Sequence, residues 1–155
     1  MKPTLYIMCG IPGSGKSTFA KKYLPGTYVS RDEIRFSHLK PGENYFSVEN
    51  TVWKEFIQKI SNSLKEGHDT IADATHISVP SRTKLLRALN ACEYNVVFVV
   101  LKTPYNICVE RNALREGRAR VANGVIAGMD NAFTIPKKED YANCKGVWLI
   151  DGYEI

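Results

Sequence analysis

GIPGSGKS, at residues 10–17, fits the phosphate-binding pattern G-x-x-x-x-G-K-[ST] at every specified position. In such a loop the glycines let backbone N–H groups turn toward a phosphate, the lysine reaches the β- and γ-phosphate oxygens, and the final hydroxyl ligates Mg²⁺. The stretch therefore predicts a nucleoside triphosphate site, with ATP as the expected ligand. We expect its binding residues to be Gly10, Pro12, Gly13, Ser14, Gly15, Lys16, Ser17 and Thr18.

The segments on either side of this loop have the order that a phosphate loop requires. A short apolar run at residues 4–9 precedes it and is typical of a buried strand. Residues 17–24 follow as a predicted helix, which Pro25 and Gly26 end. The N-terminus of that helix adds its partial positive charge to the anion site, so strand, loop and helix together favour phosphate binding.

Farther along the chain, apolar strand-like runs alternate with helical patterns. We expect strands at residues 27–30, 70–72, 95–101 and 147–150, and helices at 47–65, 80–91, 104–116 and 126–133, with 36–50 irregular. The run at 95–101 is almost wholly apolar, as in a strand buried on both faces. The fold predicted is an α/β P-loop NTPase three-layer sandwich, with a mostly parallel sheet of about five strands and helices on both faces. Its site should lie at the carboxyl ends of the strands.

Composition places broad bounds on the protein. A chain of 155 residues with 44% hydrophobic content is expected to form a single P-loop domain over residues 1–155. The net charge of +5 favours anionic partners such as nucleotides and nucleic acid. Four scattered cysteines suggest neither a zinc site nor a disulfide framework, and no apolar run reaches membrane-spanning length. We therefore expect a cytoplasmic protein without a membrane partner, for which self-association as a homo-oligomer is plausible.

Asp32 and Arg35 stand three residues apart after the second predicted strand. A carboxylate there can accept the proton of an attacking hydroxyl, and an arginine one turn away can hold the acceptor or the moving phosphoryl group. The alternative is a surface ion pair at a helix start.

Asp73 ends the third predicted strand, in the position of a Walker B acid. It can order Mg²⁺ together with Ser17, or it can contact the acceptor substrate. The sequence leaves these two roles open. A third interpretation is an N-cap for the helix that follows.

Four arginines within ten residues surround Gly117, at positions 111, 115, 118 and 120. A basic segment of this kind can close over ATP as a lid, which we place at about residues 111–133, and can stabilise phosphate charge in the transition state. The alternative is a solvated basic turn.

Taken together, these motifs resemble the phage-type polynucleotide 5′-hydroxyl kinase domain, with zeta-toxin-like small kinases as wider relatives. The matching segments occur in family order at residues 10–18, 30–35, 73–76, 80–82 and 109–115. The resemblance implies that Asp32 is the general base, that Arg35 engages the acceptor phosphate, and that Arg115 stabilises the transferring phosphoryl group. With Lys16 these residues form the expected catalytic set. It further implies that Arg111 lies near the donor nucleotide and that Arg31, Asp73 and Arg82 lie on the acceptor side.

The function that we expect is an ATP-dependent transferase that uses Mg²⁺ to move the γ-phosphate to a hydroxyl, most plausibly the 5′-OH of a nucleic acid or a nucleotide-like acceptor. A small-molecule kinase acting on a nucleoside, sugar or nucleotide sugar needs the same donor machinery. A non-catalytic nucleotide-binding module is less consistent with the sequence, which has no Asn-Lys-x-Asp guanine signature. Residues 36–50 match no family pattern, and Tyr45 and Phe46 there can either stack on a base or pack in the core.

Overall fold

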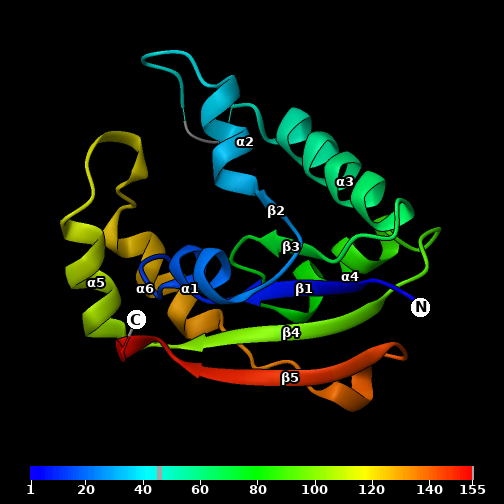
Figure 1. The fold of residues 1–155 in the computed structure, drawn as a ribbon. Helices are drawn as coiled ribbons and strands as arrows, with labels where there is room; N and C mark the ends of the chain where they lie inside the picture. Colours follow the sequence, from blue (N-terminus) through cyan, green and yellow to red (C-terminus); the bar gives the residue numbers. More distant parts are fainter. Residues whose placement is uncertain (45–46, 155) are drawn as a thin grey trace.

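The computed structural model describes residues 1–44 and 47–154, except for the side chains of Arg118 and Glu154. Its centre is a five-stranded sheet in the order β2-β3-β1-β4-β5, with every neighbouring pair parallel (Figure 1). The strands are β1 (Thr4–Cys9), β2 (Thr27–Ser30), β3 (Thr70–Asp73), β4 (Asn95–Lys102) and β5 (Cys144–Asp151). This architecture confirms the predicted α/β P-loop fold.

Helices cover both faces of this sheet. They are α1 (Lys16–Tyr23), α2 (Arg31–His38), α3 (Glu49–Lys65), α4 (Val79–Ala88), α5 (Tyr105–Ala113) and α6 (Asn123–Ala132). Side chains of α3 and α4 pack on one face of the sheet, and those of α1 pack on the other. Within residues 1–44 and 47–154, no helix has the length and apolar content to cross a bilayer.

Some element boundaries differ from those predicted. Residues 36–38 belong to helix α2, although the sequence pattern there reads as irregular. The helix forms because the Ser30 side chain accepts a hydrogen bond from the Glu33 backbone N–H at 3.2 Å, which caps its first turn. Ile34 is buried and anchors the same helix. In addition, β5 begins at Cys144, three residues before the expected strand, and α4 ends at Ala88 instead of Ala91.

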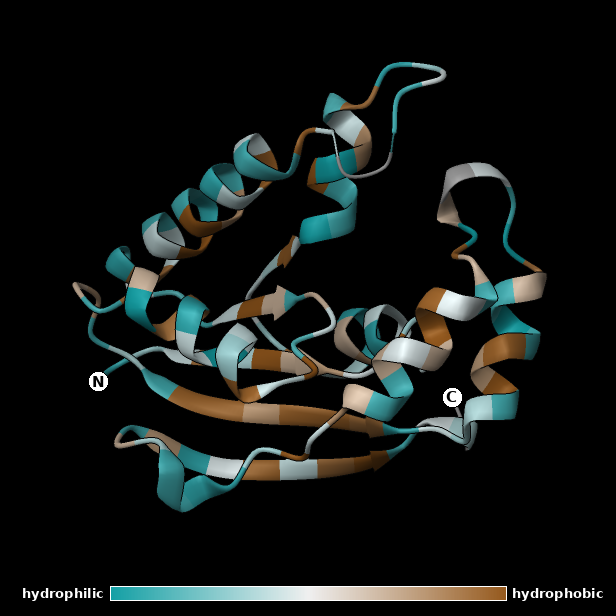
Figure 2. Cartoon of the chain, turned by 180° about the vertical axis from the view of Figure 1, so that it is seen from behind, coloured by the Kyte–Doolittle hydropathy of each residue, from teal (hydrophilic) through white to brown (hydrophobic). Residues whose placement is uncertain are grey.

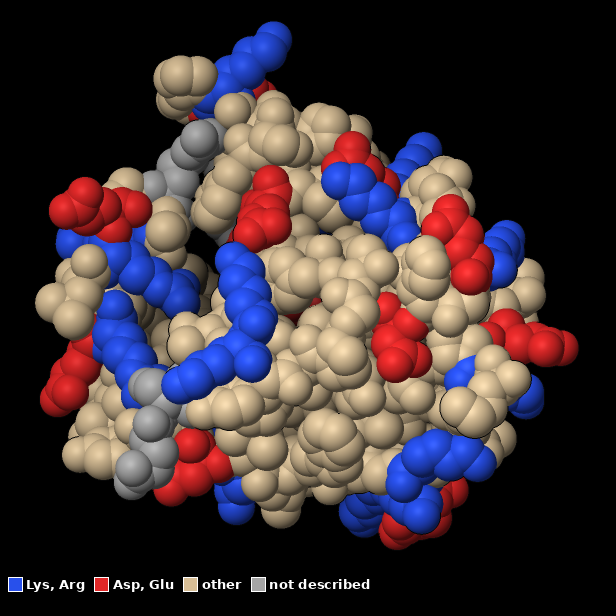
Figure 3. Space-filling view, viewed as in Figure 1, with Lys and Arg blue, Asp and Glu red and all other residues tan. Residues whose placement is uncertain are grey.

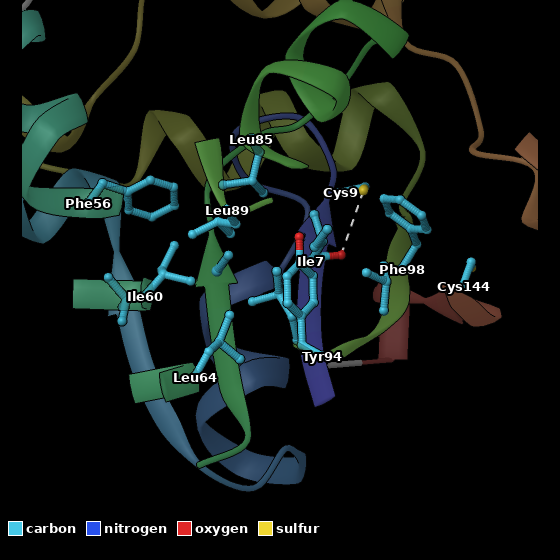
Figure 4. Close-up of a cluster of buried hydrophobic side chains, with 14 of the residues drawn as sticks. Ile7, Cys9, Phe56, Ile60, Leu64, Leu85, Leu89, Tyr94, Phe98 and Cys144 are labelled. Carbon is cyan, nitrogen blue, oxygen red and sulfur yellow. Dashed lines mark hydrogen bonds between the residues drawn. The ribbon is translucent and has the colours of Figure 1, made fainter. Parts of the chain in front are cut away.

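The main core lies between the sheet and helices α3 and α4. Figure 2 shows hydrophobic colour concentrated along the strands and on the sheet-facing sides of the helices. In Figure 4, Phe56 and Ile60 of α3 lie on one side of Ile7 and Phe98 of the neighbouring strand lies on the other, and all four are fully buried. The Cys9 thiol in the same cluster donates to the Ile7 carbonyl at 3.7 Å. This packing holds β1 in place, and the phosphate loop leaves from its end.

His76, in the loop after β3, is a buried titratable group in this core. Its Nδ1–H donates to the Met8 carbonyl at 2.8 Å, and its ring lies 6.3 Å from that of Phe56. Burial lowers the pKa of His76 from 6.5 to about 4, although the Met8 hydrogen bond and the Asp73 charge act in the opposite direction. Between these pH values the unfolded chain binds a proton that the folded protein excludes. We therefore expect the unfolding free energy to fall by about 1.4 kcal/mol per pH unit as pH drops through this window.

Denaturant titrations from pH 7 to pH 4 measure this dependence. His76→Asn removes the titrating ring, and asparagine tolerates the positive φ of 41° at this position. In this variant the slope of the unfolding free energy against pH should therefore fall by about 1.4 kcal/mol per pH unit, which corresponds to one proton. His68→Asn removes an exposed imidazole and serves as the matched control. An unchanged slope in His76→Asn would contradict the assignment.

Candidate active site

The phosphate loop joins β1 to α1 and closes tightly against α5. Gly13 and Gly15 have φ angles of 83° and 98°, a left-handed conformation that glycine adopts without strain. A Cβ atom at Gly13 would lie 2.5 Å from the Cys108 carbonyl oxygen, so only glycine fits the close approach of loop and helix. The Lys16 ammonium donates to the Ile11 carbonyl at 3.1 Å across the loop.

The remaining residues predicted to bind ATP lie in or beside this loop. The Gly10 backbone N–H donates to the Thr75 carbonyl at 2.9 Å, which ties the loop to the end of β3. Ser14 is buried, and its hydroxyl has no hydrogen-bond partner within the described part of the chain. Thr18 is exposed in the first turn of α1. The motif thus forms one continuous loop at the N-terminus of α1, with residues 10–14 buried and Ser17 and Thr18 exposed.

A pocket of about 310 Å³ lies beside the loop, at the carboxyl ends of β2 and β3. It is lined by Pro12, Lys16, Ser17, Ser30, Arg31, Asp32, Arg35, Glu49, Asp73, Ala74, Thr75, Arg115, Val121, Val125 and Met129. In Figure 3 a hollow opens between the α1–α2 side and the segment after α5, with basic side chains on its left wall. The pocket unites the predicted catalytic residues with the predicted magnesium pair.

Ser17 and Asp73 form the candidate magnesium pair. The Ser17 hydroxyl donates to Asp73 Oδ2 at 2.7 Å, although the two residues are 56 positions apart in the chain. The Tyr28 hydroxyl donates to the same carboxylate oxygen, and burial beside this carboxylate raises the pKa of Tyr28. Kinase sites hold Mg²⁺ through one or two protein oxygens together with phosphates and waters, so this donor set fits the ion. The helix that follows β3 is capped by Ser78, not by Asp73, which removes the N-cap alternative.

Asp32, Arg35 and Glu49 form a charged network on the opposite wall of the pocket. Arg35 is 5% exposed, and its guanidinium donates to Asp32 Oδ1 and, at 2.6 Å, to Glu49 Oε1. Arg31 donates to the other oxygen of Glu49 at 2.9 Å. The Asp32 carboxylate remains 58% exposed toward solvent, so it is open to an incoming acceptor. Asp32 and Arg35 therefore form an ion pair and also line the pocket.

Glu49 is a site residue that the sequence pattern does not reveal. It opens α3, lies fourteen positions after Arg35 and belongs to no short motif. Burial acts to raise the pKa of Glu49, but the hydrogen bonds and charges of Arg35 and Arg31 outweigh it and lower the pKa overall. Glu49 is therefore held as a carboxylate that orients both arginines.

Lys16 lines the same pocket and lies close to the carboxylates of Asp73 and Asp32. Burial lowers the pKa of its ammonium, whereas the nearby carboxylates of Asp73 and Asp32 act to raise it. Arg115 also lines this pocket and adds a second positive charge close to Lys16. A polyphosphate placed between Lys16 and Arg115 would meet positive charge from both sides.

Arg111 of α5 and Arg120 of the segment after it lie outside the pocket lining. Arg111 donates to the Gly152 carbonyl at 2.8 Å and to the Gly13 carbonyl at 3.4 Å, so it touches the phosphate loop from outside the pocket. Arg120 donates to the carbonyls of Arg115 and Ala113 at 2.9 and 3.0 Å and thereby braces the segment that carries Arg115. The Arg118 side chain lies outside the described residues, as do Tyr45 and Phe46. An arginine-rich lid stays a prediction.

The structure does not place Arg82, an expected acceptor residue, in the pocket. Its side chain is fully buried, and the guanidinium donates to the His76 carbonyl at 2.9 Å and to the Thr134 carbonyl. Because its donors face backbone oxygens, it joins the loop after β3 to the segment that follows α6.

We expect Arg82→Met to lower the unfolding free energy by about 2–4 kcal/mol, because the buried His76 carbonyl and the partly buried Thr134 carbonyl lose their donor. Chemical denaturation measures the change, and Arg87→Met on the exposed side of the same helix is the control, with an expected effect within about 0.5 kcal/mol. If Arg82→Met is as stable as the unmodified protein but has a raised KM for the acceptor, Arg82 instead contributes to acceptor binding.

A phosphate loop between β1 and α1, a parallel sheet and a pocket at its carboxyl edge define a P-loop protein of the kinase-like α/β class. The chain belongs to the AAA_33 family, described as AAA domain, which matches residues 5–136. It is thus a member of a P-loop kinase family.

Three known proteins illustrate the similarity. L-seryl-tRNA(Sec) kinase of Methanococcus maripaludis is 30% identical over 145 residues, which cover 85% of this chain and 53% of the relative. A chain of the Pnkp1/Rnl/Hen1 RNA repair complex superposes with a TM-score of 0.74 at 24% identity, over 92% of this chain and 47% of that one. A sugar kinase from Janibacter sp. HTCC2649 gives a TM-score of 0.66 at 15% identity, over 99% and 87%. The chain thus spans about half the length of the first two proteins.

Proposed function

We propose that this protein is an ATP-dependent kinase that transfers the γ-phosphate to the 5′-hydroxyl of a polynucleotide. The observation that carries the proposal is that Lys16 and Ser17 of the phosphate loop line one pocket of about 310 Å³ together with the Asp32 carboxylate and Arg35. A protein that only bound or sensed nucleotides would need the phosphate loop but not this second charged wall.

The donor side follows from the phosphate loop. Backbone N–H groups of residues 13–18 and the Lys16 ammonium would bind the β- and γ-phosphate oxygens, with the N-terminus of α1 adding partial positive charge. Ser17 and Asp73 would hold Mg²⁺, which when bound neutralises charge on the β- and γ-phosphates. Arg111 would contact the donor nucleotide near the outer edge of the loop.

The acceptor side follows from the charged network. Asp32 would accept the proton of the attacking hydroxyl while the new oxygen–phosphorus bond forms and the bond from the γ-phosphorus to the β-phosphate oxygen breaks. Arg35, already oriented by Glu49, and Arg31 would hold a phosphate of the acceptor. Arg115 would stabilise the charge that spreads over the transferring group. Closure of the segment at about 111–133 would exclude water, which otherwise accepts the phosphoryl group.

A second candidate is a small-molecule kinase acting on a nucleoside or sugar. It is favoured by the pairing of Arg31 and Arg35 with the same Glu49, which partly neutralises the acceptor wall. Carboxylate oxygens there can accept hydrogen bonds from sugar hydroxyls. The sugar kinase from Janibacter has the same fold, and it is consistent with this alternative.

Transfer of ³²P from γ-labelled ATP with Mg²⁺ to a 5′-hydroxyl oligonucleotide tests the proposal. The matched control is the same oligonucleotide carrying a 5′-phosphate, which offers no acceptor hydroxyl at that end. Label on the 5′-hydroxyl strand alone supports the polynucleotide kinase function. ATP hydrolysis without oligonucleotide labelling supports the proposed ATP site but not the polynucleotide acceptor, and nucleosides and sugars are then tested as acceptors. No turnover of ATP with any acceptor contradicts both candidates.

A further inference from the structure

Two cationic side chains lie over one tryptophan beside the acceptor wall of the pocket. The Arg31 guanidinium carbon is 5.2 Å from the centre of the Trp53 ring, and the Lys84 ammonium is 4.4 Å from it. Both distances fall within the range of a cation–π interaction. The three residues come from α2, α3 and α4, so three separate helices converge on this point.

This cluster continues the pocket outward. Arg31 lines the pocket and binds Glu49, whereas Trp53 and Lys84 lie outside the pocket lining. The Arg31 Nε is buried and has no hydrogen-bond partner within the described part of the chain. Lys84 is exposed and forms no ion pair with any described residue. Cationic side chains therefore run from buried Arg35 through Arg31, both of which pair with Glu49, to Lys84 at the surface.

Trp53 gives these cations a fixed position. Its ring packs partly against the main core, so it is a rigid support for side chains that would otherwise be mobile. An ammonium over an aromatic face keeps its other N–H donors free for a ligand. The electrostatic attraction to the ring also lowers the entropy that Lys84 loses when it binds an anion.

We propose that Arg31, Trp53 and Lys84 form a phosphate subsite that binds a phosphodiester of the acceptor strand beyond the terminal nucleotide. The proposal rests on the proposed function and specifies its substrate class: an oligonucleotide binds better than a mononucleotide because its second phosphate reaches this subsite. A small sugar or nucleoside would not extend to Lys84. The subsite therefore selects polymeric acceptors.

Binding of a 3′-labelled single-stranded oligonucleotide, measured by fluorescence anisotropy across a salt series, tests this subsite. Loss of one phosphate contact reduces the slope of log K against log salt by about 0.7 for a single strand. We expect this reduction in Lys84→Ala and Trp53→Leu, a weakening of about two- to fivefold, and a smaller effect in Trp53→Phe, which keeps an aromatic face. Lys65→Ala, an equal charge change at the far end of α3, is the matched control.

Competition by a nucleoside 3′-phosphate in the same assay measures the affinity for a single nucleotide, with which that for the oligonucleotide is compared. The advantage of the oligonucleotide over this mononucleotide should shrink in Lys84→Ala and persist in Lys65→Ala. If Lys84→Ala keeps the slope and the length preference of Lys65→Ala, the subsite is refuted while the kinase proposal stands. If the unmodified protein binds ATP but no oligonucleotide at any salt concentration, the polynucleotide acceptor itself is refuted. Thermal melting identifies a Trp53→Leu variant that fails to fold, and Lys84→Ala then decides the question.

Discussion

Asp32→Asn should lower kcat for phosphoryl transfer by about 10²–10⁴ while the Kd for ATP changes only a few-fold. Asparagine preserves the shape of the side chain and can still accept a hydrogen bond from Arg35, but it cannot take the proton of the attacking hydroxyl. The Asp32 carboxylate lines the pocket with Lys16, and the phosphate loop itself remains intact. Steady-state kinetics with a 5′-hydroxyl oligonucleotide and calorimetric binding of a non-hydrolysable ATP analogue separate the two quantities.

Glu33→Gln is the matched control for this experiment. It makes the same chemical change one residue farther along α2, at a side chain that is 62% exposed and pairs with Lys21 at 3.3 Å outside the pocket. Its transfer rate should stay near that of the unmodified protein. A rate for Asp32→Asn within tenfold of Glu33→Gln would show that another group, or water, accepts the proton.

Much of this fold is predictable from local pattern. The phosphate loop fixes the order of strand, loop and helix, and the apolar run at residues 95–101 identifies a strand with both faces buried, observed as β4. Helix α2 is harder to predict because it has only eight residues and few of them are apolar; its buried residues are Ile34 and Arg35. The Ser-x-x-Glu pattern at residues 30–33 indicates only its start, where the Glu33 backbone N–H donates to the Ser30 side chain.

The residues of the candidate site also differ in how far the sequence predicts them. Lys16 and Ser17 are predictable because one short motif contains both, and Asp73 because it ends an apolar strand. Glu49 is not, since its partners Arg35 and Arg31 are fourteen and eighteen positions away and only the α2–α3 packing brings them together. Family order alone also does not predict where a side chain points. Arg82 occupies its family position, yet its guanidinium is turned toward backbone carbonyls in the interior.

Arg115→Ala should lower kcat for transfer by about a thousandfold or more, with a much smaller change in the KM for ATP. The reason is that an arginine at this point interacts most strongly with the charge that spreads over the phosphoryl group in the transition state, not with ground-state ATP. Arg115 lines the pocket near Lys16, and Arg120 braces its backbone at 2.9 Å, so its position is set before the reaction begins. Single-turnover transfer at saturating ATP measures the chemical step directly.

Arg115→Lys distinguishes charge from geometry, because lysine keeps the charge but lacks the planar fork that can bind two phosphoryl oxygens. We expect it to recover less than a tenth of the lost rate. Arg87→Ala, an exposed arginine on α4, is the control for charge removal alone and should transfer phosphate normally. Arg120→Ala should give an intermediate loss, since it frees the segment that carries Arg115 without removing its guanidinium. Equal rates in Arg115→Ala and Arg87→Ala would mean that Arg115 takes no part in stabilising the transition state. The charge on the transferring phosphoryl group would then have to be balanced by Lys16 and Arg35 in the pocket.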